Sequence, residues 1–191
     1  MGVLFDCCGK PVSELGLEEQ EEKIIRRINE RLHVSGIQEI VMLCPNCYYF
    51  LKDKLEIQVL SIYEKLSQLG IGRKVEGEGR LFLPCPDREE QQWVSWLNPF
   101  FQQEPEIIKG TQCCGLGGCA GGKEPDLARD MACHVAEEGY KKVYTYCASC
   151  AGNLTRNGCK GVSHLLTEIL DFHEQPDVAR SMINRMMTKF W

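Results

Sequence analysis

Cysteines stand in short clusters along the chain, and the spacing of these clusters points to a shared chemistry. Adjacent cysteines followed by glycine occur in CCGK (7–10) and again in CCGL (113–116). A CxxC motif follows each of them, CPNC (44–47) and CASC (147–150). Thiolates that converge from separate segments are the ligands that zinc and iron–sulfur clusters take in proteins. The pattern therefore indicates metal-binding or reactive thiols.

The rest of the composition is that of an ordinary globular protein. The 191 residues are 43% hydrophobic and 26% charged, enough for one large domain or two small ones. The net charge of −5 argues against nucleic acid as a main partner, and no apolar run is long enough to span a membrane. The first ten residues lack the basic region, apolar core and cleavage site of a secretory signal. We therefore expect a cytoplasmic protein.

The 12 cysteines would predict disulfides in a small secreted chain, but a chain of this length in a reducing compartment does not need them. Four cysteines lie outside the motifs: Cys85, which follows a predicted strand, and three that are not expected to be ligands. Cys133 falls on an apolar helical stripe and is expected in the core, and Cys159 follows a loop and is expected to be structural. Cys119 lies in a glycine-rich loop and is expected to be a thiol near the site rather than a ligand.

An internal duplication relates the two halves of the chain. A nearly constant interval separates Cys8 from Cys114, Cys44 from Cys147, and Ser61 from Ser163. A constant offset across three landmarks is the signature of a repeat. We therefore divide the chain into a first copy, residues 1–78, and a second copy, residues 79–191.

Each copy is predicted to be a small α/β unit. Apolar residues at helical spacing predict helices over 17–32 and 124–139, and short β-rich runs predict strands over 39–43 and 142–146. A further strand over 80–84 opens the second copy. Alternating strands and helices favour parallel pairing. The expected fold is therefore α/β, with two similar subdomains, each a small and mostly parallel sheet flanked by helices.

One cysteine, Cys85, follows the strand predicted over 80–84. The ends of strands are where α/β folds build their sites, so Cys85 is expected to join the CCG and CxxC motifs of the second copy. Its counterpart in the first copy would precede Met1, so we expect that copy to be truncated at its N-terminus. The complete set in the second copy is therefore Cys85, Cys113, Cys114, Cys147 and Cys150, against Cys7, Cys8, Cys44 and Cys47 in the first.

The order of a leader cysteine, CCG and CxxC resembles the cysteine-rich CCG domain, most closely in CCGLGG (113–118) and CASCAGNL (147–154). That domain occurs in one of the subunits of heterodisulfide reductase. It also occurs in iron–sulfur subunits of anaerobic glycerol-3-phosphate dehydrogenase, of some succinate dehydrogenases and of lactate-utilisation complexes. The resemblance covers the whole chain as two tandem copies. The interval from Cys85 to Cys113 is short for the family, and the first copy has no leader cysteine.

The resemblance implies an iron–sulfur subunit of a heterodisulfide-reductase-like oxidoreductase, which transfers electrons or reduces a disulfide. The five cysteines of the second copy would bind a 4Fe–4S cluster, of the cubane or the noncubane kind. The four of the first copy would bind zinc or a second iron–sulfur cluster. The implied partners are other subunits of a redox complex, a flavoprotein or a ferredoxin-like protein, and a disulfide substrate.

Two other functions compete on the residues alone. Four cysteines per copy also suit a zinc-stabilised interaction module, although such sites rarely need a CC pair or a fifth cysteine. The CPNC motif after a strand also fits a thioredoxin-like thiol oxidoreductase, although that mechanism gives no reason for the CCG motifs or for a second CxxC. Metal content separates the three functions.

Several residues around the motifs carry expectations of their own. Gly9 and Gly115 are expected to adopt positive φ so that both cysteines of each CC pair face one site, and Gly117 and Gly118 are expected to let the backbone approach a cluster. His164 is expected to cap a helix rather than to tune the site. At the C-terminus, a stripe of apolar residues is expected to pack on its own domain, with docking to a partner subunit as the alternative: Val178, Met182, Met186 and Phe190.

Overall fold

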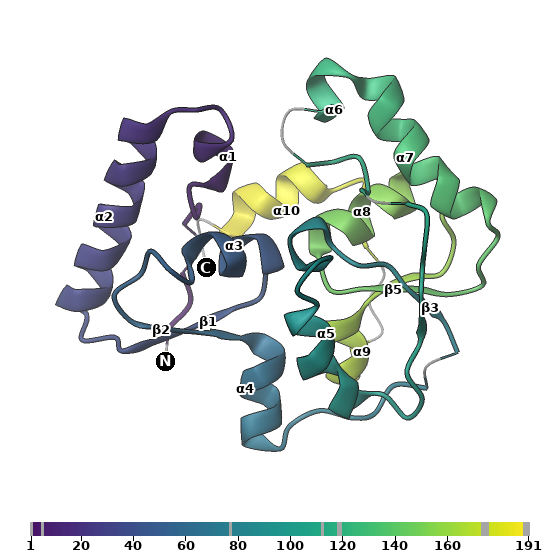
Figure 1. Ribbon diagram of the computed structural model, residues 1–191, viewed down its shortest axis with the longest axis horizontal. Helices are drawn as coiled ribbons and strands as arrows, with labels where there is room; N and C mark the ends of the chain where they lie inside the picture. Colours follow the sequence, from purple (N-terminus) through teal and green to yellow (C-terminus); the bar gives the residue numbers. More distant parts are fainter. Residues whose placement is uncertain are drawn as a thin grey trace.

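The computed structural model describes residues 2–4, 6–76, 78–111, 113–117, 120–172 and 176–188 (Figure 1). Figure 1 shows the elements of the first copy, in purple to blue, on one side and most of those of the second copy, in teal to green, on the other, with α10 in yellow drawn between them. The first copy contains α1 (Lys10–Ser13), α2 (Glu18–Val34), β1 (Glu39–Met42), α3 (Pro45–Leu51), β2 (Gln58–Ser61) and α4 (Ile62–Leu69).

The second copy begins with a short strand and a 3-10 turn and continues with alternating helices and strands. Its elements are β3 (Arg80–Leu81), η1 (Cys85–Asp87), α5 (Gln92–Leu97), η2 (Asn98–Phe100), β4 (Glu106–Ile107), α6 (Ala120–Lys123), α7 (Pro125–Glu137), β5 (Val143–Thr145), α8 (Ala148–Arg156), β6 (Val162–His164), α9 (Leu165–Ile169) and α10 (Ser181–Met187).

Parallel pairing of strands confirms the α/β fold. Strands β1 and β2 form a two-stranded sheet, and a four-stranded sheet has the order β4-β3-β5-β6. Every pair is parallel. Glu39 pairs with Gln58 in the first copy, and Val143 pairs with Val162 in the second. The strand before the CxxC motif therefore pairs in the same register with the strand after it in both copies. The repeat seen in the sequence is therefore also a repeat in topology, while the boundary at residue 78 stays a prediction.

The helices begin where the sequence signals them. Helix α2 starts with three glutamates in its first turn, which the positive end of the helix dipole favours, and buries Ile28 and Leu32. Helix α7 has proline in its first turn and buries Ala128, Ala132 and Val135. Both helices differ from their predicted bounds by only one or two residues at each end.

The strand predicted over 80–84 is shorter than expected. Strand β3 has two residues, although the Phe82 amide still donates to the Tyr144 carbonyl at 2.8 Å. Pro84 has no N–H group with which to continue a ladder, so the pairing ends and η1 begins at Cys85. Strand β4 was not predicted, because two residues give no readable alternation.

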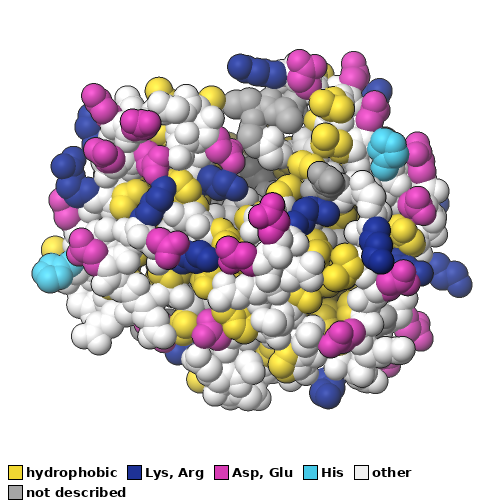
Figure 2. Space-filling model, in the orientation of Figure 1, with side chains coloured by type: hydrophobic (Ala, Val, Ile, Leu, Met, Phe, Trp, Pro, Cys, Tyr) yellow, Lys and Arg dark blue, Asp and Glu magenta, His cyan; other side chains and the backbone are white. Residues whose placement is uncertain are grey.

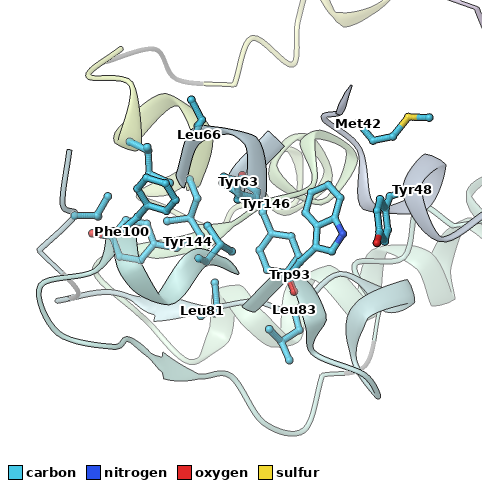
Figure 3. Close-up of a cluster of buried hydrophobic side chains, with 14 of the residues drawn as sticks. Met42, Tyr48, Tyr63, Leu66, Leu81, Leu83, Trp93, Phe100, Tyr144 and Tyr146 are labelled. Carbon is cyan, nitrogen blue, oxygen red and sulfur yellow. The ribbon is translucent and has the colours of Figure 1, made fainter. Parts of the chain in front are cut away.

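One hydrophobic core joins the two copies. It contains Tyr48 and Tyr63 from the first copy, and Trp93, Tyr146 and Leu165 from the second. Trp93 stacks on Tyr146 with ring centroids 5.9 Å apart and meets the edges of Tyr48 and Tyr63 (Figure 3). A smaller core lies within the second copy, between α7, α8 and the sheet. The two copies therefore stabilise each other through buried aromatic area.

The C-terminal helix α10 does not pack as expected. Met182 is 77% exposed and Met186 is 62% exposed, so the prediction that this stripe packs on its own domain is wrong for these two residues. Phe190 lies outside the described residues. The Asp177 carboxylate accepts hydrogen bonds from the Arg180 amide and the Asn184 side chain, so local polar contacts rather than an apolar face hold the start of the helix. Docking to a partner stays a prediction.

The surface carries charges of both signs. Figure 2 shows acidic and basic side chains intermixed over the face that it presents, without the extended basic area that phosphate backbones require. Within the described ranges, no helix has both the length and the apolar character needed to span a membrane.

Candidate metal centre

Both CxxC motifs lie where a parallel strand turns into a helix. Cys44 follows β1 and precedes α3, and Cys147 follows β5 and precedes α8, each with an extended backbone at the N-cap position. The second cysteine of each motif, Cys47 or Cys150, lies in the first turn of the helix. This geometry brings both sulfurs of a motif to the same end of the sheet.

The CCG motifs form sharp turns at glycine, as predicted. Gly9 has φ of 92° and Gly115 has φ of 83°, a region that residues with a Cβ rarely adopt. The Gly115 amide donates to the Cys113 sulfur at 3.3 Å. The glycine therefore both reverses the chain and supplies a hydrogen bond to a sulfur. Gly118 lies outside the described residues.

Replacing Gly115 with alanine is expected to destabilise the second copy. A Cβ at this position would lie 1.9 Å from the Ala128 carbonyl oxygen in α7, and the positive φ alone costs about 1–2 kcal/mol. We expect the free energy of unfolding, measured in urea, to fall by more than about 2 kcal/mol. Gly117→Ala is the matched control, because nothing lies within 4 Å of its added Cβ. Equal stability of the two variants would contradict this account of the turn.

The structure brings together all five cysteines predicted for the second site. The Cys85 and Cys113 sulfurs are 3.7 Å apart, and Cys113 also hydrogen-bonds to its neighbour Cys114. Cys150 in turn hydrogen-bonds to both Cys114 and Cys147. The five thiols therefore form one connected set drawn from three segments of the chain.

The first site brings together three of its four predicted cysteines. Cys47 hydrogen-bonds to both Cys44 and Cys8, which repeats the arrangement of Cys150 with Cys147 and Cys114. Cys7 is exposed, and no hydrogen bond joins it to another cysteine among the described residues. The first site is thus a smaller version of the second.

The pKa values of the thiols follow the same pattern in both sites. The hydrogen bond from Cys47 lowers the pKa of Cys8 and of Cys44 to about 6, although burial opposes it, and the hydrogen bond from Cys150 lowers the pKa of Cys114 to about 6. The same bonds raise the pKa of Cys47 and Cys150, which are the donors. In the second site, hydrogen bonding from Cys150 also lowers the pKa of Cys147. Each site thus contains two thiols whose pKa is lowered beside one whose pKa is raised, and the thiolate is the form that binds metal.

Access to the second site is from one side. Cys114, Cys147 and Cys150 are buried, whereas Cys113 is partly exposed and Cys85 is exposed. Burial and the nearby Cys113 raise the pKa of Cys85 to about 11. The buried Asn153 side chain donates to the Cys114 carbonyl at 2.6 Å and fixes the inner cysteine against α8. A molecule that reaches this site from solvent therefore meets Cys85 and Cys113 first.

The two sites lie close to one another. The charge of Cys44 acts on Cys147, and the Asn46 side chain of the first CxxC reaches the Cys147 sulfur at 4.0 Å. Cysteines of both copies therefore contribute to one region of the molecule.

The thiols lie in hydrogen-bonded rather than metal-ligand geometry. In the part of the chain that the structure describes, no group of three or more His, Cys, Asp or Glu side chains has the arrangement of a metal site. The donor set nevertheless suits an iron–sulfur cluster chemically, because at least four sulfurs converge, two of them favour the thiolate form, and a backbone amide already donates to a sulfur.

Comparison with known protein families agrees with this geometry. A model of the cysteine-rich CCG domain matches residues 4–52 and 102–155, which together make up more than half of the chain. The chain belongs to the cysteine-rich CCG domain family. The two matches fall on the two copies, so this CCG protein carries the domain twice. No curated protein matches the chain.

The cysteines outside the CCG and CxxC motifs take other positions. Cys133 is partly buried on α7, with its sulfur 3.9 Å from the Asn157 carbonyl, and Cys159 is buried in the core of the second copy. Among the described residues, the hydrogen bonds of both sulfurs go to backbone carbonyls and not to the connected cysteines of the CCG domain. Cys119 lies outside the described residues.

His164 caps a helix, as expected. Its Nδ1 accepts a hydrogen bond from the Leu166 amide at 3.3 Å at the start of α9. Burial lowers its pKa to about 4, although a hydrogen bond to the Tyr146 backbone acts in the opposite direction. His164 is therefore neutral at neutral pH.

Acidification is expected to destabilise the CCG protein through His164. In the unfolded chain this histidine takes up a proton below about pH 6.5, whereas in the folded chain it does so only near pH 4. The resulting stability is complete above pH 6.5 and is lost as the pH falls towards 4. The control variant is His164→Asn, which can still cap α9. When the pH falls from 7 to 5, we expect the free energy of unfolding, measured in urea, to fall by about 1–2 kcal/mol less in His164→Asn than in the parent. Parallel losses in the two proteins would exclude this role.

The sequence patterns did not indicate two polar residues that lie near the sites, Asp87 and Asn46. Asp87 is fully buried two residues after Cys85 and accepts hydrogen bonds from the Tyr49 and Tyr146 hydroxyls. Asn46 contacts the opposite site. The only available signal was position, because both residues lie beside motif cysteines and both tyrosines flank a CxxC motif.

Proposed function

We propose that this CCG protein is an iron–sulfur subunit of a heterodisulfide-reductase-like oxidoreductase. The observation that supports the proposal is the connected set of five thiols in the second copy, which joins a CCG turn, a CxxC motif and the leader Cys85. The proposed ligands of a 4Fe–4S cluster are Cys85, Cys113, Cys114, Cys147 and Cys150.

When bound, such a cluster supplies a centre that gains and loses single electrons. The chain would hold such a cluster among largely buried thiols, and the Gly115 amide, which donates to the Cys113 sulfur, would favour the more negative, reduced state. Asn153 holds the Cys114 backbone, and the exposed Cys85 edge leaves one side open to a partner. These features suit a centre that exchanges electrons with another molecule.

The proposed overall reaction is transfer of electrons to a disulfide or to another acceptor. Reducing a disulfide breaks one S–S bond, and each sulfur takes one electron and one proton to give two thiols. A reduced flavoprotein or ferredoxin-like subunit would supply the two electrons, and water would supply the protons. Simple electron relay to an acceptor in a neighbouring subunit needs only the supply of electrons by the partner and not the cleavage of a disulfide.

For the first site we propose zinc or a second iron–sulfur cluster, with Cys7, Cys8, Cys44 and Cys47 as the ligands. The support is the repeated hydrogen-bonded arrangement of Cys8, Cys44 and Cys47. The double variant Cys44→Ser, Cys47→Ser should lose the metal of the first site, which is either zinc or the iron of a second cluster, while the second copy keeps its iron. Unchanged zinc and iron would mean that the first site binds no metal.

One observation favours a second candidate function, a metal-independent thiol oxidoreductase. Cys44 stands at the N-terminus of α3 in a CPNC motif, and hydrogen bonding from Cys47 lowers the pKa of Cys44 to about 6, a range typical of reactive thiols. Such a protein would reduce small disulfides in the absence of metal, with electrons from a dithiol.

Anaerobic reconstitution separates these functions. The purified protein is analysed for iron, acid-labile sulfide and zinc, reduced, and followed by EPR while disulfides are added. Iron with sulfide, and an EPR species that appears only with a disulfide, supports disulfide reduction, and reoxidation by general acceptors alone supports electron relay. Zinc alone favours the interaction module, and disulfide reduction without metal favours the thiol oxidoreductase.

A further inference from the structure

Asn46 links the two sites across the interface between the copies. It lies inside the first CxxC motif, in the first turn of α3, and its Nδ2 points to the Cys147 sulfur of the second site at 4.0 Å. That distance is at the outer limit of a hydrogen bond to sulfur. Cys147 is 2% exposed, so this contact lies in a region from which water is largely excluded.

Lys10 fixes which way the amide of Asn46 points. The Lys10 Nζ donates to Asn46 Oδ1 at 2.7 Å. Because an ammonium group can only donate, the amide oxygen must face Lys10, and the amide N–H groups then face Cys147. A charge-assisted hydrogen bond to the oxygen also polarises the amide and strengthens its N–H donors.

The first CCG motif positions Lys10. Gly9 turns the chain with φ of 92°, and Lys10 is the first residue of α1. An ion pair to Glu14 at 3.5 Å also holds the ammonium group. The backbone of the first site therefore places the Lys10 ammonium group beside the oxygen of the Asn46 amide, whose N–H groups face the second site.

The corresponding residue of the second CxxC does not make the reverse contact. Ser149 occupies the position of Asn46 in the repeat, but it is exposed and lines a cavity of 610 Å³ beside α8 and the C-terminal segment. Within the described residues, its side chain makes no hydrogen bond to Cys44. The contact between the sites therefore runs in one direction, from the first copy to the second.

We propose that Asn46, oriented by Lys10, is a positioning residue through which the first copy raises the reduction potential of the centre in the second copy. This inference rests on the proposed function, because it requires a metal at Cys147. An N–H group directed at a ligating sulfur stabilises the more negative state of the centre, which is the reduced one. Without Asn46, reduction of the second centre becomes harder, although none of its ligands has changed.

The test is a redox titration of the full chain, reconstituted anaerobically and monitored by EPR. In Asn46→Leu, which keeps the size of the side chain but removes the donor, we expect about tenfold fewer reduced centres at a fixed potential, equivalent to about 59 mV for one electron. Asn46→Asp, which keeps the bond to Lys10 but faces Cys147 with an acceptor, should lower the potential further. Lys10→Met should lower it less.

Ser149→Ala is the matched control and should leave the potential unchanged, because among the described residues no hydrogen bond joins its side chain to the opposite site and the variant keeps its backbone N–H near Cys147. A merely structural role of Asn46 would lower the unfolding temperature of Asn46→Leu without moving the potential. That result would overturn the inference, as would a potential in Ser149→Ala that falls as much as in Asn46→Leu.

Cobalt(II) separates a failure of this inference from a failure of the proposed function. If the chain binds cobalt but not iron, the iron–sulfur proposal fails. The thiolate-to-cobalt absorption band should still move to lower energy in Asn46→Leu, because the sulfur loses its hydrogen bond. An unmoved band would overturn the role of Asn46. Binding of neither metal would overturn both.

Discussion

Replacing Cys147 with serine is expected to remove most of the iron from the second copy while the chain stays folded. Cys147 lies at the N-terminus of α8, is 2% exposed, and hydrogen bonding from Cys150 lowers its pKa, which favours the thiolate form that the proposed cluster would need from this ligand. Losing an outer hydrogen-bond partner already weakens a metal site by about 10- to 100-fold, and losing a ligand is more severe. Iron and sulfide analysis after anaerobic reconstitution measures the effect.

Cys133→Ser is the control for this experiment. Its sulfur lies beside the Asn157 carbonyl, outside the connected thiols, and a serine hydroxyl can make the same contact. We expect Cys133→Ser to keep its full iron content, and Cys114→Ser to behave like Cys147→Ser. A Cys147→Ser and a Cys114→Ser protein that both kept the full iron content would show that the ligands are assigned wrongly.

The features of the fold that repeat along the chain were predictable from the sequence. Both strand–CxxC–helix units were expected, because short apolar strands run directly into the motifs and because the motifs recur at one interval. The positive φ at Gly9 and Gly115 was expected from the geometry that two adjacent cysteines need to face one site, although in the first copy Cys7 is exposed and does not join the site. Such features depend on local sequence and on the period of the repeat.

The contacts that join the copies were not predictable in the same way. Asp87 contacts Tyr49 and Tyr146 only because η1, α3 and the end of β5, which Tyr146 follows, come together in the folded chain, and no local sequence pattern indicates that contact. The same holds for Asn46, whose neighbours Lys10 and Cys147 are remote from each other in the sequence. The exposed methionines of α10 illustrate the opposite error. Their helical spacing correctly predicts an apolar stripe, but it does not indicate whether another element packs against that stripe.

Asp87 is the buried polar residue at the centre of this junction. Its Oδ1 accepts hydrogen bonds from the Tyr49 hydroxyl and from the Trp93 amide, the latter at 3.1 Å. Its Oδ2 accepts from the Tyr146 hydroxyl at 2.6 Å. Tyr49 comes from the first copy and Tyr146 from the second, so one carboxyl group joins the copies. Burial first, and then Asp87, raise the pKa of Tyr146, which keeps its hydroxyl protonated as a donor.

Asp87→Ala is accordingly expected to destabilise the protein by about 3–5 kcal/mol, because it leaves two hydroxyl donors and an amide without their acceptor at a site with 0% exposure. Asp126→Ala, which removes a carboxylate that is 88% exposed, should cost less than about 1 kcal/mol. Urea unfolding, monitored by the fluorescence of Trp93 and the other tryptophans, gives both values.

Tyr49→Phe and Tyr146→Phe test whether Asp87 acts through both copies. Each variant removes one donor and should cost about 1–2 kcal/mol, and each loss should shrink strongly when Asp87 is already alanine, because the partner is then absent. Since Asp87 and Cys85 share the same 3-10 turn, Asp87→Ala should also lower the iron content of the second copy. If the losses of the tyrosine variants simply add to that of Asp87→Ala, the shared carboxyl group does not couple the two copies, and the aromatic core alone holds them together.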